Sequence, residues 1–196
     1  MEPVPVTSAG LVLVWPLIPR WLHAAGLLTK SSEDAPAGFA DDADRLRAAQ
    51  ALDYVAWGDE SDGNGSTGRR STTSTWLVGL PSDTDAPTAE PLLADLRAQL
   101  DQQLAAALNQ LIQLQFHAGQ SRTGLRGVTV QDLRQLYLQR PGQVLPNDSG
   151  ATVSVDLHPG DILLWGLPWP LEQVAYPWLD NPLKISWELP QLPAQA

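Results

Sequence analysis

The residues of this chain that could carry chemistry are carboxylates, three histidines and eight tryptophans. Acidic residues beside indole rings are typical of sugar-processing clefts, in which two carboxylates flank a glycosidic bond. The candidates for such a cleft are Asp156, Asp161 and Glu172, close in sequence to Trp165 and Trp169. We favour a structural role for Asp161, because it follows a Pro-Gly turn, where aspartate commonly caps backbone groups. A glycan-active enzyme is the catalytic alternative.

The histidines and one acidic loop give little support for a metal or cofactor site. His23, His117 and His158 lie far apart in the sequence, without a second ligand at metal-binding spacing. Residues 59–65, DESDGNG, have the oxygen-rich composition of a calcium loop but lack its bidentate final glutamate and flanking helices. The sequence has no cysteine, no HExxH, no phosphate-binding glycine loop and no GxSxG elbow. We therefore expect no cofactor, no metal and no catalytic residue.

Charge argues against nucleic acid as a partner. The chain has 12 basic and 22 acidic residues, for a formal charge of −10. A phosphate-binding surface needs clustered lysine and arginine, and the adjacent pair Arg69–Arg70 is too small to form one.

The hydrophobic run at 11–18 is too short to cross a bilayer and is interrupted by Pro16. The acidic, proline-rich start MEPVPV lacks the basic region of a signal peptide. We therefore expect no transmembrane segment, no signal peptide and a cytoplasmic location.

Apolar spacing predicts helices over most of the first 140 residues. Helices are expected at 18–25, at 41–58 after an acidic start, and from Thr129, which begins a capping box, to about 140. The strongest pattern lies at 91–119 and predicts one long amphipathic helix. Its apolar stripe consists of Leu93, Leu96, Leu100, Leu104, Ala107, Leu111 and Leu114.

Apolar residues alternate with polar ones near the end of the chain. The pattern predicts strands at 151–157, 162–165 and 183–189. The expected fold is therefore α+β, with a helical N-terminal two-thirds and a small antiparallel β-sheet at the C-terminal end. We expect residues 1–190 to form a single domain with a flexible Gly/Ser/Thr-rich insertion at 59–75, followed by a loose tail at 191–196.

Residues 163–189 interleave four tryptophans with four prolines. Because proline fixes turns and removes backbone donors, the indoles should be held rigidly. They either fill a local core or anchor a protein interface, and a cluster of four favours at least one exposed anchor. The candidate interaction residues are Trp165, Leu167, Pro168, Trp169, Pro177, Trp178 and Trp187.

The same segment resembles the D-x-LL-x-x-LPW…PW…VEW signature that ends the contractile injection system tape measure proteins. The residues that match it and the preceding helix end are Leu133, Leu138, Arg140, Gly142, Asp161, Leu163, Leu164, Leu167, Pro168, Trp169, Pro177, Trp178, Trp187 and Glu188. Residues 8–28, 45–58 and 76–81 resemble three further blocks of that family in the same order. Ser8 stands where the family has asparagine, and the lysine and cysteine of the third block are missing.

This resemblance implies a non-catalytic structural or assembly component of a phage-tail-like contractile injection system. It implies docking to other proteins of that system, namely baseplate, hub or spike, or inner-tube initiation proteins. Members of the family are usually much longer, so we interpret the chain as a short paralogue of the C-terminal domain. An adaptor or chaperone for cargo loading, whose acidic surface holds a basic partner, is the alternative. Whether several copies enter one assembly is left open.

Overall fold

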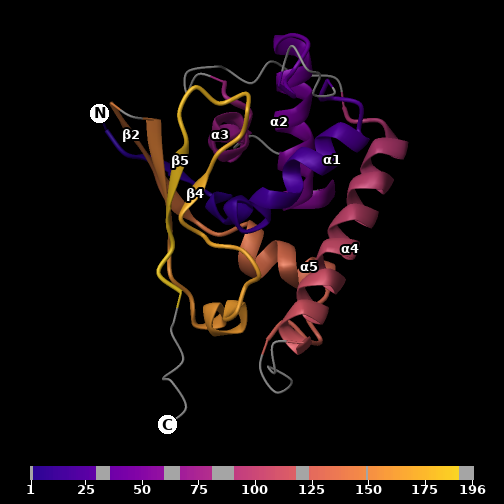
Figure 1. The fold of residues 1–196 in the computed structure, drawn as a ribbon, viewed down its shortest axis with the longest axis vertical. Helices are drawn as coiled ribbons and strands as arrows, with labels where there is room; N and C mark the ends of the chain where they lie inside the picture. The colour runs from indigo at the N-terminus through magenta and orange to yellow at the C-terminus, as the bar shows by residue number, and fades with distance from the viewer. Residues whose placement is uncertain are drawn as a thin grey trace.

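A five-stranded sheet forms one side of the molecule and the long helix α4 forms the opposite side (Figure 1). Helices α1 and α2 lie between them. The computed structural model describes residues 2–29, 36–59, 67–80, 91–117, 124–148 and 150–189, with the backbone alone for 67–72. The predicted α+β class and the long helix are confirmed.

The N-terminal segment passes through the centre of the molecule. After the edge strand β1 (Val4–Val6), the 3₁₀ helix η1 (Ala9–Leu17) leads into α1 (Ile18–Ala24). Residues 9–14 of η1 are buried, and η1 contacts both the sheet and the helices. Pro16 lies inside η1, which agrees with the expected interruption before the first α-helix. Gly26, with φ of 72°, follows α1 as the predicted stop.

Helices α2 (Asp42–Trp57) and α4 (Ala94–His117) agree closely with the predicted ranges. The side chain of Asp41 accepts a hydrogen bond from the Asp44 amide at 2.9 Å and caps α2. In α4 the buried apolar residues are Leu100, Leu104, Ala107, Leu108 and Leu111. The expectation for the two ends of the stripe was wrong: Leu93 precedes the helix and is 77% exposed, and Leu114 is 37% exposed. At the inward position beside Leu114 the chain instead places Gln115.

The predicted flexible insertion at 59–75 is partly wrong, because helix α3 spans Thr67–Val78. Thr73, Ser74 and Thr75 are buried, and α3 packs against α2. This part of α3 is rich in small polar residues, so apolar periodicity gave no signal, and packing against α2 overrides the weak local preference. Residues 60–66 of the predicted insertion lie outside the described residues.

The capping box predicted at Thr129 is confirmed, with the Asp132 amide donating to the Thr129 hydroxyl at 3.1 Å. It starts α5 (Val130–Leu133), which continues as one π-helical turn, η3 (Arg134–Leu138).

The sheet has the order β1-β2-β3-β5-β4, and its pairs are antiparallel except for the parallel pair β3–β5. Its C-terminal strands are β2 (Gly142–Asn147), β3 (Gly150–Val155), β4 (Gln173–Val174) and β5 (Leu183–Ser186). The strands predicted at 151–157 and 183–189 correspond to β3 and β5. The short strands β1, β2 and β4 were not predicted.

The strand predicted at 162–165 was wrong, because residues Pro159–Leu164 form the 3₁₀ helix η4. Pro159 occupies the first helical position, and Nδ1 of His158 accepts a hydrogen bond from the Gly160 amide. The Asp161 carboxylate accepts from the His158 amide at 3.0 Å and completes a capping box. These local bonds explain why the apolar sequence DILL bends into a helical turn.

Candidate functional site

The structure divides the seven candidate interaction residues by exposure. Trp178 and Trp187 are buried, at 8% and 6% exposure. Pro168 and Pro177 are exposed, whereas the half-buried members are Trp165, Leu167 and Trp169. Trp178 and Trp187 therefore belong to the core of this fold, and the accessible members of the cluster are Pro177 and the residues between Trp165 and Trp169.

Hydrogen bonds from aromatic side chains connect the C-terminal segment to the N-terminal half of the chain. The indole N–H of Trp169 donates to the Leu13 carbonyl at 2.9 Å, and that of Trp178 donates to the Leu77 carbonyl at 3.0 Å. In the reverse direction, the indole of Trp15 donates to the Pro170 carbonyl at 3.1 Å. The segment that carries the exposed residues is thus held against η1 and α3, as expected for a rigid surface.

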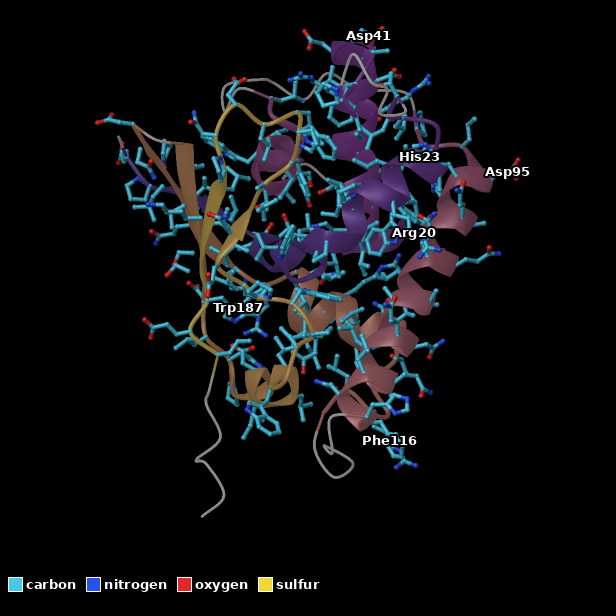
Figure 2. The ribbon with its side chains drawn as sticks, in the orientation of Figure 1. Arg20, His23, Asp41, Asp95, Phe116 and Trp187 are labelled. Carbon is cyan, nitrogen blue, oxygen red and sulfur yellow. The ribbon has the colours of Figure 1, made fainter. Side chains whose placement is uncertain are left out.

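A buried ion pair positions the end of β5. Arg140 Nη2 lies 2.8 Å from Asp161 Oδ1, and the two side chains are only 5% and 1% exposed. Trp187 Nε1 donates to the other carboxylate oxygen at 3.2 Å. Figure 2 shows Trp187 at the end of the sheet that leads toward η4. Asp161 therefore joins the segments that contain Arg140, Trp187 and His158. Its carboxylate is not free, as a catalytic acid of the glycan-cleft alternative would have to be.

An open groove of about 630 Å³ lies beside this ion pair. Its apolar wall comes from Trp165, Leu167, Trp169, Leu171 and Leu189, with Trp187 and Glu188 also in the lining. We call this surface the indole groove. A second hollow of about 410 Å³ is lined by Leu157, His158, Pro159, Asp161 and Glu188. The exposed surface of the second hollow is mostly apolar, whereas that of the indole groove is about equally polar and apolar.

Gln115 holds one wall of the indole groove, and the sequence did not identify it. Its amide nitrogen donates to the carbonyls of Leu163 at 2.9 Å and Trp165 at 3.1 Å. Its amide oxygen accepts from the Leu125 amide at 2.8 Å, so this buried side chain joins α4 to the C-terminal end of η4 and to the loop that contains Leu125. A glutamine on a predicted apolar face was the available signal, because a buried amide needs partners.

A second polar network joins α2, α4 and η3, away from the indole groove. Arg134 donates to the Asp101 carboxylate at 2.7 Å and to the Val55 carbonyl at 3.0 Å. The Tyr54 hydroxyl donates to the same carboxylate at 3.0 Å. Burial and the Asp101 charge raise the pKa of Tyr54 to about 12. Each of these groups is satisfied by another group of the network, so we infer that the network stabilises the fold rather than binding a ligand.

The pKa values of all three tyrosines of the chain are raised, which predicts how the stability of the protein changes at alkaline pH. Burial and the Asp161 charge raise the pKa of Tyr137 to about 12, and burial raises the pKa of Tyr176 well above 10. Because the folded pKa exceeds the unfolded value near 10, this contribution to stability is complete below pH 10 and is lost as the pH rises toward 12. In an alkaline titration, phenolate absorbance should rise together with loss of the circular dichroism signal. Phenolate formation near pH 10 in the folded protein would contradict the assignment.

No group of three or more potential metal ligands occurs among the described residues. Of the histidines, His158 caps η4, and His23 and His117 are exposed on α1 and α4. The calcium-loop interpretation falls mainly on residues 60–65, outside the described part of the chain. Within that part, no helix combines the length and hydrophobicity that crossing a membrane requires.

Comparisons with known proteins agree with the sequence blocks. The family model of the contractile injection system tape measure protein matches residues 1–187. Searches of curated proteins and of solved structures gave no match. The family match extends from the edge strand β1 to Trp187, so it includes η1, the helices, the sheet and most of the indole groove. The chain therefore belongs to the contractile injection system tape measure protein family and is a structural component of such a system.

Proposed function

We propose that this protein docks onto another component of the injection system through the indole groove. The partner is a baseplate, hub or inner-tube initiation protein, and the contact involves no catalysis. The observation that carries the proposal is the groove itself, an open surface hollow of about 630 Å³ whose lining includes partly exposed indole and leucine side chains.

The exposure pattern of the aromatic segment supports an interface. Trp165, Leu167 and Trp169 expose part of their side chains next to exposed Pro168, whereas Trp178 and Trp187 are buried in the core. Tryptophan in a partly open, rigid setting is the residue type most enriched among energetic centres of protein interfaces. Since the indole hydrogen bonds fix the segment before binding, little conformational entropy is lost on docking.

The rest of the groove also favours a role in binding over one in catalysis. Glu188 is the ionisable residue in the lining of the groove. The carboxylate of nearby Asp161 is paired with Arg140 at 2.8 Å. A glycosidase needs two free carboxylates in one cleft, one on each side of the glycosidic bond. The arrangement supports docking better than glycan hydrolysis.

Co-expression of the tagged protein with each baseplate, hub and inner-tube protein of its own system tests the proposal. One of these should be captured with the wild-type chain, and capture should persist from low to moderate salt, because apolar contacts are weakly screened. Release of the partner by moderate salt would favour the adaptor or chaperone alternative, in which charge holds a basic partner. Capture that is unchanged by the double substitution Trp165→Ser and Leu167→Ser would rule out the groove.

A further inference from the structure

We infer that the occupant of the indole groove is a protein segment that presents one arginine or lysine between apolar side chains. This inference rests on the proposed docking function and specifies the chemistry of the partner. Its basis is the position of Glu188, which lines both the indole groove and the second hollow beside it.

Glu188 lies between the two hollows and has apolar side chains on both sides. On one side are the indole-groove residues Trp165 and Leu167, and on the other are Leu157, 64% exposed, and Pro159. Trp187, immediately before Glu188, is buried, whereas Glu188 is exposed at the centre of a tight turn, in which the Leu189 amide donates to the Trp187 carbonyl at 3.0 Å. A partner that covers both hollows must therefore cover the Glu188 carboxylate.

Nothing in the described residues neutralises this carboxylate. Glu188 forms no ion pair there, and the linings of the two hollows contain neither lysine nor arginine. The other carboxylate, Asp161, already has Arg140 at 2.8 Å and the indole N–H of Trp187 at 3.2 Å. His158 lines the second hollow as well, and its Nδ1 accepts a hydrogen bond from the Gly160 amide at 2.9 Å; no ion pair joins it to Glu188 among the described residues.

The cost of desolvation then selects the partner. An occupant with apolar side chains alone would bury the Glu188 charge unpaired, which is strongly unfavourable. An acidic occupant would add repulsion between like charges. A guanidinium or ammonium group opposite Glu188 removes both problems, and arginine can also stack on the neighbouring indole rings. The required pattern is apolar, basic, apolar.

A random peptide library displayed on phage provides the probe. The library is selected on the immobilised full chain and depleted on the Trp165→Ser and Leu167→Ser variants, each checked for folding by circular dichroism. Depletion leaves peptides that need the groove, rather than basic peptides attracted by the overall negative charge. The same selection is repeated on Glu188→Lys and on the control Asp148→Lys, an exposed residue in the β2–β3 turn outside both linings.

Groove-dependent peptides should share a basic residue between apolar ones, and Glu188→Lys should select an acidic residue in its place. The control should select the same peptides as the wild type. A selected peptide should bind Glu188→Gln at least about tenfold more weakly than the wild type. Groove-dependent peptides without a basic residue, or identical peptides from Glu188→Lys, would overturn this inference and leave docking intact. If no groove-dependent peptide is obtained, both this inference and the groove as docking surface fail.

Discussion

Replacing Gly10 with alanine should prevent the chain from reaching its native fold. A Cβ on Gly10 would lie 1.6 Å from the Tyr137 carbonyl oxygen and 3.1 Å from the Arg140 Cβ. The obstructing atom belongs to the backbone of η3, so no rotamer change relieves the overlap, and η1 must move away from η3. Overpacking of ordinary side chains costs about 1–3 kcal/mol, and a backbone clash at a fully buried site should exceed that range.

Gly38→Ala is the matched control, because a Cβ there meets no atom within 4 Å. Urea unfolding followed by circular dichroism should give a wild-type midpoint for Gly38→Ala and little or no folded protein for Gly10→Ala. A Gly10→Ala variant with a midpoint close to that of the control would contradict the packing of η1 on η3.

Removal of the Arg140 side chain should cause the second-largest loss of folding stability. Arg140→Met leaves the Asp161 carboxylate, 1% exposed, without its cation. Breaking a buried pair in this way costs about 3–5 kcal/mol, a large share of the roughly 5–15 kcal/mol that stabilises a typical domain. We expect a marked fall in the urea midpoint and loss of the fixed geometry around Trp187.

The double variant Arg140→Met and Asp161→Asn separates charge from packing. It removes both charges and keeps an amide oxygen as acceptor for the Trp187 indole, so it should recover part of the lost stability. Asp59→Asn is the control, since it breaks the Arg97–Asp59 pair, in which the aspartate side chain is 90% exposed, and it should cost less than about 1 kcal/mol. Equal effects of Arg140→Met and Asp59→Asn would contradict the role of the buried pair.

Much of the helical structure could be predicted from local sequence. The acidic start at Asp41, the capping box at Thr129 and the stop at Gly26 each depend on bonds or dihedrals within a few residues, so the sequence contains them directly. The long stripe of α4 was also visible. The exposure of Leu93 and Leu114 at the two ends of that stripe could not be predicted, because it depends on how far the neighbouring elements extend.

The elements that were missed depend on distant partners. Strand β1 exists because Val4–Val6 pair with β2, across well over a hundred residues of sequence. Helix α3 has few apolar residues in its first half and is supported by α2. The π-helical turn η3 places Arg134 beside Asp101, a pairing that no local pattern indicates.

The exposure of the candidate site residues could not be predicted from the sequence. Proline and tryptophan spacing identified residues 163–189 as a rigid aromatic segment, and the indole hydrogen bonds agree with that rigidity. The sequence could not separate inward Trp178 and Trp187 from partly open Trp165 and Trp169, because all four have similar neighbours. A glutamine on an apolar face indicates a buried amide that needs partners, but the sequence could not identify Leu163 and Trp165, which lie about 50 residues away.

The proposed function predicts that the indole groove holds this protein in the injection-system particle. The most direct measurement is the amount of the protein in purified particles, relative to tube protein, by quantitative mass spectrometry. The control is Leu145→Ser, an exposed leucine on the sheet outside the groove, and both variants are first checked for folding by circular dichroism. We predict that Trp165→Ser with Leu167→Ser lowers incorporation at least about tenfold while the control does not. Wild-type incorporation of the folded groove variant would contradict the claim.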